Sequence, residues 1–230
     1  IDVQGLLTDD MADQLRDYQR PYARPASEAA DFPATGPGGK ISLADVVATI
    51  HPTILVGTST APHTFTEAII RDMASHCDRP IILPLSNPTK LAEADPTDLL
   101  HWTDGKALIA TGSPFPEVEY NGVTYAIGQA NNAMLYPGLG LGAIVAKATK
   151  VSDAMLAAAA KAVASCADHS TLGAALLPAV SNLRTISATV AVEVAKAAEA
   201  EGLAKAKLDD VIQQVQDAMW QPQYVPFDAV

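Results

Sequence analysis

The sequence predicts an α/β fold in which a parallel sheet is covered by helices and followed by a helical tail. Short apolar segments, each bounded by turn residues, alternate with amphipathic segments between residues 42 and 125. These apolar segments are short and nearly continuous, as is typical of parallel strands buried on both faces. After Asn131 the apolar residues recur only with helical spacing, which predicts the tail.

The composition limits the classes of protein to which the chain can belong. A chain of 230 residues with 49% hydrophobic residues can bury a sizeable core. Its net charge of −11 argues against nucleic acid or an anionic membrane as a partner, because binding phosphates requires clustered Lys and Arg. No apolar run approaches the roughly 18 residues of a membrane span, and the N-terminus has no signal-like core, so we expect a cytoplasmic protein.

The first elements follow a polar segment. Residues 9–40 are charged and rich in Pro and Gly, which predicts a connecting segment with one short helix. Ser42 and Asp45 form a capping-box pattern that begins a helix, and Pro52 ends it. Residues 53–57 then form a short buried strand.

The pattern continues to residue 125. Thr64 and Glu67 repeat the capping pattern before a second helix, which stops at Asp78-Arg79-Pro80. Strands are predicted at residues 81–85 and 107–110, with a short helix at residues 98–102 between them. Residues 118–125 predict a hairpin that turns at Asn121-Gly122.

The second half is predicted to be helical. A long apolar stretch reaches Lys147, a helix capped by Ser152 follows, and two further amphipathic helices carry apolar residues between 186 and 219. We read the glycines at 138, 140 and 142 as sites of close helix packing. We therefore expect an α/β domain over residues 1–150 and a helical extension over residues 151–230 that packs on it.

Three polar loops are candidate binding sites. Ser86-Asn87-Pro88 follows a predicted strand, and ligands bind at the carboxyl ends of strands in open α/β sheets. Gly57-Thr58-Ser59-Thr60 follows the preceding strand, where hydroxyls and N–H groups can meet a ribose or phosphate. The segment 128–132, with Asn131 and Asn132, precedes a helix and can hold a carboxylate or carboxamide. Taken singly, each also reads as an ordinary turn or an N-cap.

The sequence predicts no metal site. The two cysteines lie outside any Cys-x-x-Cys pair, and the histidines show no ligand spacing, so we expect packing or surface thiols and surface or loop histidines. These residues are Cys77, Cys166, His51, His63, His76, His101 and His169.

Several motifs in fixed order resemble the malic enzyme family, from Asp2 to about Tyr224. They are Asp2-x-x-Gly5-Leu6-Leu7, Phe65-Thr66-Glu67, Arg79-Pro80-Ile81-Ile82, Leu85-Ser86-Asn87-Pro88-Thr89, Thr103-Asp104-Gly105, Ala110-Thr111-Gly112-Ser113-Pro114-Phe115, Gly128-Gln129-Ala130-Asn131-Asn132 and Tyr136-Pro137-Gly138. The resemblance implies a Rossmann-type domain that binds NAD(P), with L-malate and Mg²⁺ or Mn²⁺ across a cleft. Hydride leaves the malate hydroxyl carbon, the keto acid loses carbon dioxide, and the enol is protonated to pyruvate.

The resemblance also implies roles for single residues. Asn87 and Asn132 would bind malate oxygens, and Asn87 and Asn131 would lie against the nicotinamide part of the cofactor. Gly57, Thr58 and Ser59 would line the cofactor cleft, and Asp2 would hold the adenosine ribose at the end of a second Rossmann strand. Relatives that use NADP tend to carry Lys near the position of Gln19, so Gln19 with Asp2 favours NAD.

The family's phosphate-binding turn, acid/base residues and metal ligands are expected upstream of Ile1. The chain begins with Ile where a strand ends, so we expect an incomplete Rossmann-type sheet that lacks its first strands and is inactive alone. No catalytic residue or metal ligand is assigned within the chain. Three functions remain open: an NAD-linked malic enzyme that forms homo-oligomers, a malolactic enzyme that holds NAD tightly and releases L-lactate, and a non-catalytic assembly fragment.

Overall fold

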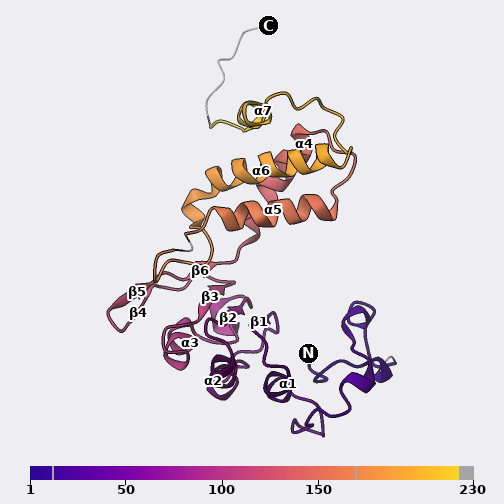
Figure 1. Ribbon diagram of the computed structural model, residues 1–230, viewed down its shortest axis with the longest axis vertical. Helices are drawn as coiled ribbons and strands as arrows, with labels where there is room; N and C mark the ends of the chain where they lie inside the picture. The colour runs from indigo at the N-terminus through magenta and orange to yellow at the C-terminus, as the bar shows by residue number, and fades with distance from the viewer. Residues whose placement is uncertain (12, 169, 223–230) are drawn as a thin grey trace. The chain divides into compact units, whose positions relative to one another are not determined.

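A computed structural model describes residues 1–11, 13–168 and 170–222 of the chain, so His169 and the end of the family resemblance, from residue 223, lie outside the described residues. The chain divides into two compact units, Ile1–Ile127 and Gly128–Val230. Figure 1 labels the helices and strands of both units.

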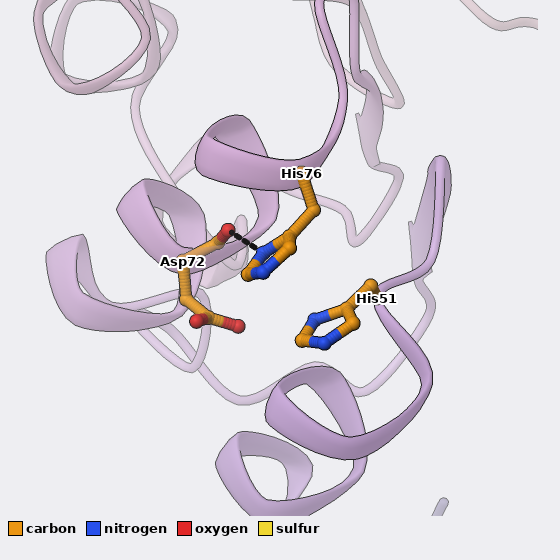
Figure 2. Close-up of side chains that lie close together, drawn as sticks. All are labelled: His51, Asp72 and His76. Atoms are coloured by element: carbon orange, nitrogen blue, oxygen red, sulfur yellow. Dashed lines mark hydrogen bonds between the residues drawn. The ribbon is translucent and has the colours of Figure 1, made fainter.

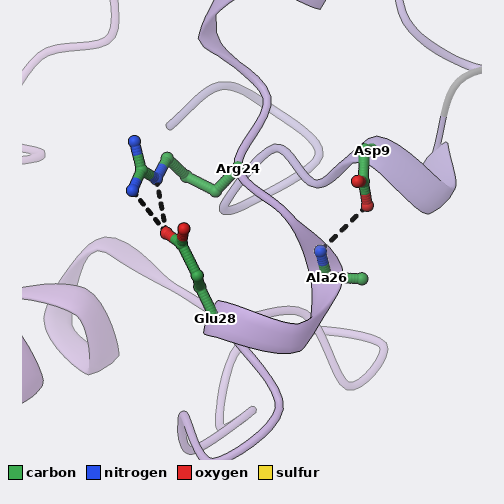
Figure 3. A network of polar contacts seen from close by, with 4 residues as sticks. All are labelled: Asp9, Arg24, Ala26 and Glu28. Carbon is green, nitrogen blue, oxygen red and sulfur yellow. Dashed lines mark hydrogen bonds and ion pairs between the residues drawn. The ribbon is translucent and has the colours of Figure 1, made fainter.

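The N-terminal segment is an ordered coil rather than a segment with one short helix. It contains three single-turn 3-10 helices, η1 (Asp9–Met11), η2 (Arg20–Tyr22) and η3 (Ala26–Glu28). Pro21 lies in η2 and Pro25 precedes η3, positions that proline tolerates because the backbone N–H there has no helical partner. Asp9 accepts a 2.9 Å hydrogen bond from the Ala26 N–H, and Arg24 pairs with Glu28 (Figure 3).

The first unit contains the predicted parallel strands. They are β1 (Ile54–Gly57), β2 (Ile81–Pro84) and β3 (Leu108–Thr111), paired in that order. Between and before them run α1 (Leu43–Ile50), α2 (Glu67–His76) and α3 (Pro96–Trp102). The short helix η4 (Thr89–Leu91) follows β2, and the predicted hairpin is formed by β4 (Val118–Tyr120) and β5 (Val123–Tyr125).

Within this unit one face of β1 is not covered, contrary to the prediction of a sheet buried on both faces. Leu55 is buried in the core with Ile70 and Met73 of α2, whereas Ile54 and Val56 are each 53% exposed. The strand order follows the chain order, so the crossovers all run in one direction. Right-handed crossovers in one direction place their helices on the same face, as the first unit shows for the crossover helices α2 and α3 (Figure 1).

The helix starts test the capping predictions. The capping box of Ser42 and Asp45 is present at α1. The predicted cap at Thr64 is wrong, because the Phe65 N–H donates to the Glu93 carbonyl and the chain is still extended there. Thr66 caps α2 instead, and α3 begins two residues earlier than predicted, with Asp95 as its cap and Pro96 in its first turn.

The second unit is helical, as predicted. After the short strand β6 (Gly128–Gln129) it contains η5 (Asn132–Met134), α4 (Tyr136–Val145), α5 (Asp153–Ser165), η6 (Val180–Asn182), α6 (Leu183–Ala200) and α7 (Val211–Ala218). Helices α4 and α5 both pack on α6, which buries Val190 and Val194. The described helices include none that is long and apolar enough to cross a bilayer.

Two of the three glycines of α4 serve close helix packing. A Cβ atom at Gly138 would lie 2.5 Å from the Val190 Cβ, and one at Gly142 would lie 2.5 Å from the Ala191 carbonyl oxygen. A Cβ at Gly140 would meet nothing within 4 Å. The packing interpretation is therefore confirmed at Gly138 and Gly142 and is wrong at Gly140.

Candidate functional site

The parallel register brings two of the predicted polar loops together. Gly57 ends β1 opposite Pro84, which ends β2, and the Leu85 N–H continues the ladder to the Gly57 carbonyl oxygen at 2.8 Å. Residues 58–60 and 86–88 therefore leave the same edge of the sheet side by side. This is the edge at which ligands bind in open α/β folds.

A buried carboxylate holds these two loops in place. Glu93 is fully buried, and its Oε1 accepts 2.8 Å hydrogen bonds from both the N–H and the hydroxyl of Ser59. The same oxygen accepts from the Ser86 hydroxyl, and Oε2 accepts from the Ser86 N–H at 3.3 Å. The Thr60 N–H donates to the Ser86 hydroxyl oxygen at 2.8 Å, which links the loops a second time.

These hydrogen bonds keep Glu93 ionised. Burial raises the pKa of Glu93, but hydrogen bonds from Ser86 and Ser59 to the carboxylate outweigh it and hold the pKa below its ordinary value of 4.5. The group is an acceptor for four protein donors. We therefore read Glu93 as a residue that positions the loops.

The loop after β1 exposes less binding capacity than its sequence suggests. Gly57 is buried, and a Cβ there would lie 2.5 Å from the Glu93 Cδ, so the glycine makes room for Glu93. The N–H groups of Ser59 and Thr60 are used within the protein. Thr58 is exposed at the strand end and is the member of this loop best placed to meet a ligand.

The Asn87 amide is fixed but exposed. Its Nδ2 donates to the Leu85 carbonyl oxygen at 3.2 Å, and its Oδ1 accepts from the Ser113 hydroxyl at 2.6 Å. Because a carbonyl can only accept, this contact sets which way the amide points. The amide keeps a second N–H and a second lone pair for a ligand.

The turn after β3 supports this arrangement. A Cβ at Gly112 would lie 2.0 Å from the Leu85 carbonyl oxygen, so only glycine permits this approach. Ser113 is buried, and its carbonyl accepts from the Thr111 hydroxyl at 2.8 Å. The motif at residues 110–115 thus places the hydroxyl that orients Asn87.

Asp2 is also held in a defined orientation. One carboxylate oxygen accepts from the Val3 N–H at 2.7 Å and the other from the Gln19 side chain at 2.6 Å. Together these bonds lower the pKa of Asp2 below its ordinary value of 3.8. Gln19 is buried while Asp2 is exposed, so the carboxylate remains ionised and accessible.

Asn131 and Asn132 belong to the second unit, and both are exposed. Asn131 is the N-cap of η5, and its side-chain oxygen accepts from the Ala133 N–H at 2.9 Å. The capping alternative is therefore confirmed for Asn131. Asn132 starts the same helical turn.

Comparison with known proteins identifies the family. Residues 1–199 match the family profile described as "Malic enzyme, NAD binding domain". The chain belongs to the malic enzyme family. Its residues 1–199 form the NAD-binding domain of that family, and the α/β fold and the NAD cofactor expected from the sequence are confirmed.

Curated relatives include NAD-dependent malic enzymes and malolactic enzymes. The chain is 59% identical to NAD-dependent malic enzyme 3 of Bacillus subtilis over all 230 residues, which span 40% of that protein. It is 50% identical over 188 residues to the malolactic enzyme of Leuconostoc mesenteroides, where the match covers 82% of this chain and 35% of that protein. The chain thus spans well under half the length of these relatives.

Solved malic enzymes share the fold. The structure from Entamoeba histolytica matches with a TM-score of 0.69 at 24% identity, covering 94% of this chain and 40% of that one. The structure from Pyrococcus horikoshii Ot3 matches with a TM-score of 0.60 at 24% identity, covering 77% of this chain and 37% of that one.

The malic enzyme domain offers groups that suit NAD but not the family's metal. Asp2 presents a carboxylate and Thr58 and Asn87 present polar groups at strand ends, as a dinucleotide requires. Within the described residues, the group of His, Cys, Asp or Glu side chains close enough to share an ion is His51, Asp72 and His76. Imidazoles suit Zn²⁺, Cu²⁺ or Ni²⁺ better than Mg²⁺ or Mn²⁺, so these residues do not fit that metal.

Sequence reasoning missed three residues of this site. The sequence assigned Glu93 no role, and its burial and hydrogen bonds reveal one. Ser86 and Ser113 stood inside quoted motifs, but nothing in the pattern showed that one holds Glu93 and the other orients Asn87. Its two small apolar neighbours, Ala92 and Ala94, were the available signal for Glu93.

Proposed function

We propose that this chain is the NAD-binding part of a longer enzyme that oxidises L-malate with NAD and decarboxylates the product to pyruvate. The observation that carries the proposal is the 59% identity over the whole chain to an NAD-dependent malic enzyme. NAD supplies the hydride acceptor when it is bound. The proposal includes a cytoplasmic location and a homo-oligomer, which cell fractionation and light scattering of the purified enzyme test.

Asn87 is proposed to bind a malate oxygen or the nicotinamide amide. Its orientation is fixed by Leu85 and Ser113, so its remaining N–H is presented to a ligand without a further loss of side-chain freedom. A hydrogen bond from a preset donor to a carboxylate contributes about 1.5–3 kcal/mol. Asn132, on the second unit, is proposed as a second contact to malate.

Asp2 is proposed to accept hydrogen bonds from the adenosine ribose. Two of its acceptor positions are taken by Val3 and Gln19, and the carboxylate keeps others for ribose hydroxyls. A 2′-phosphate would bring negative charge against this carboxylate, which supports NAD over NADP. Thr58 and Ser59 at the end of β1, with Asn131, complete the proposed cofactor contacts, whereas Gly57 makes room for Glu93.

A malolactic enzyme is the second candidate, because malolactic relatives reach 50% and 51% identity. The test incubates the full-length protein with L-malate, NAD and Mn²⁺ while following NADH, pyruvate and lactate in one sample. NADH appearing with pyruvate supports the proposal. Lactate without NADH supports the malolactic enzyme. If neither pyruvate nor lactate is formed, the result favours a non-catalytic assembly fragment.

An Asn87→Ala variant tests the site itself. We expect kcat/KM for malate to fall about 10- to 100-fold, which corresponds to one lost hydrogen bond to a charged group. Asn182→Ala is the matched control, because Asn182 is exposed and makes no side-chain cap bond at α6. Equal values of kcat/KM for the two variants would show that Asn87 does not bind malate.

A further inference from the structure

Three potential metal ligands meet where α1 and α2 end. His51 is the C-cap residue of α1, and Asp72 and His76 lie four residues apart on the last turns of α2. Residues at this spacing share one helix face. One potential ligand atom from each side chain, an imidazole nitrogen or a carboxylate oxygen, lies within 4.8 Å of the other two.

The two imidazoles lie face to face. Their ring centroids are 3.6 Å apart and their planes differ by 17°, and Figure 2 shows the Asp72 carboxylate beside them. Both histidines are exposed, so each ring can rotate about its side-chain bonds without moving the backbone. A tetrahedral zinc site requires ligand atoms about 3.3 Å apart, as Zn–N bonds of about 2.0–2.1 Å imply, and in-plane lone pairs that converge on the ion. Zinc binding therefore requires the two stacked rings to turn out of their parallel arrangement.

His76 is oriented as a ligand. Its Nδ1 lies 3.0 Å from the Asp72 carbonyl oxygen and 2.9 Å from the Ser75 hydroxyl, and because a carbonyl can only accept we assign the proton to Nδ1. The Ser75 hydroxyl also donates to this carbonyl, at 2.7 Å. The other nitrogen, Nε2, is then unprotonated and can bind a metal. Metal-binding histidines commonly show this outer hydrogen bond.

Asp72 supplies an independent observation. Its Oδ2 is inaccessible to solvent and has no hydrogen-bond partner among the described residues. A buried oxygen without a donor is costly, and an ion is one of the groups that satisfies it. Both helices also end at this point, and a helix C-terminus carries partial negative charge that favours a cation.

We propose that His51, Asp72 and His76 bind a borderline divalent metal, with Zn²⁺ as the ion to test. Two imidazoles and one carboxylate form a three-ligand set that leaves a fourth position for water. His51 precedes β1 and His76 precedes β2, which places the cluster at the amino-terminal edge of the sheet. Asn87 and Thr58 leave the opposite edge, so this zinc site is independent of the proposed malate chemistry.

The test is calorimetric titration of the full chain with Zn²⁺ in the presence of excess Mg²⁺. We expect saturable one-to-one binding, an increase in Tm with Zn²⁺, and at least about a 10-fold loss of affinity in each ligand variant. The variants are Asp72→Asn, His76→Gln and His51→Asn, the last because Asn tolerates the positive φ of 45° at this position. Far-UV circular dichroism verifies that each variant is folded.

His101→Gln is the matched control. His101 lies in the last turn of α3, is exposed, and its Nδ1 contacts the carbonyl four residues earlier at 2.7 Å, as His76 does. It is not part of the three-residue cluster. Unchanged zinc affinity in this variant supports the proposal. Absence of saturable binding, or zinc binding that survives the His51→Asn and His76→Gln pair and is lost in Cys77→Ser, would overturn it.

Discussion

Replacing Glu93 by Gln tests whether one buried carboxylate holds the loops at the carboxyl ends of β1 and β2. Gln has nearly the same shape, so the change removes charge without opening a cavity. The Oε1 position can still accept from Ser59 and the Ser86 hydroxyl. The new NH₂ group, however, faces the Ser86 N–H, so two donors oppose each other.

The expected cost follows from these contacts. A hydrogen bond to a charged group contributes about 1.5–3 kcal/mol and a neutral one about 0.5–1.5 kcal/mol, so each of three retained bonds weakens by about 1 kcal/mol. Part of this loss is offset because burying a neutral amide costs less than burying a carboxylate. We therefore expect the free energy of unfolding to fall by about 2 kcal/mol.

Urea denaturation with a pH series measures this effect. Because the pKa of Glu93 is held below its ordinary value of 4.5, its stabilisation is present above pH 4.5 and is lost as pH falls through the folded-state pKa. The difference in the free energy of unfolding between the parent and Glu93→Gln should therefore disappear at acid pH. Glu67→Gln is the control, since Glu67 is in an exposed pair with Arg71 and should cost under about 1 kcal/mol. Equal stabilities for the parent and Glu93→Gln at neutral pH would refute the role of Glu93.

Three other perturbations test the remaining structure. Gly142→Ala should lower the free energy of unfolding by about 1–3 kcal/mol, because its Cβ would lie 2.5 Å from the Ala191 carbonyl oxygen. Gly140→Ala should raise it by about 1 kcal/mol, because its Cβ would meet nothing within 4 Å. Urea denaturation of both variants measures the two changes. Hydrogen bonds from Thr35 and Ser42 lower the pKa of Asp45 to about 2, so its stabilisation is present above pH 3.8 and is lost as pH falls through about 2. The Tm values of Asp45→Asn and the parent should therefore converge as the pH falls. A difference in Tm that does not change with pH would contradict this role of Asp45. Asp2→Ala should weaken the binding of NAD about 10- to 100-fold in a fluorescence titration. An unchanged Kd for NAD would show that Asp2 does not contact the cofactor.

The sequence predicts the elements whose causes are local. Ser42 and Asp45 cap α1, Ser152 caps α5, and Asn121-Gly122 turns the hairpin, because each depends on neighbours within a few residues. The start of α2 was misplaced because a long-range contact keeps Phe65 extended. Burial of both faces is confirmed at β3, where Ile109, Ala110 and Thr111 are all buried, but not at β1, where Ile54 and Val56 are exposed.

The site shows the same division between local and distant causes. The position of Asn87 at a strand end follows from the alternation of strands and helices, so the sequence could indicate it. Glu93 and Ser59 are 34 residues apart, and His51 and His76 are brought together only by the packing of α1 on α2. Such pairings depend on tertiary structure, so spacing rules based on nearby ligands could not predict them.

The Ser86-Asn87 pair combines folding and binding in adjacent residues. Ser86 points inward to Glu93 and the Thr60 N–H, whereas Asn87 is exposed and is oriented by Ser113. Because Ser86 holds the loop in place and Asn87 faces a ligand, a change in this loop can lower activity in two distinct ways. A change at Ser86 acts through the geometry of both loops and lowers stability, whereas a change at Asn87 removes one donor to a ligand. Stability and kinetics measured on the same variant therefore separate the two causes.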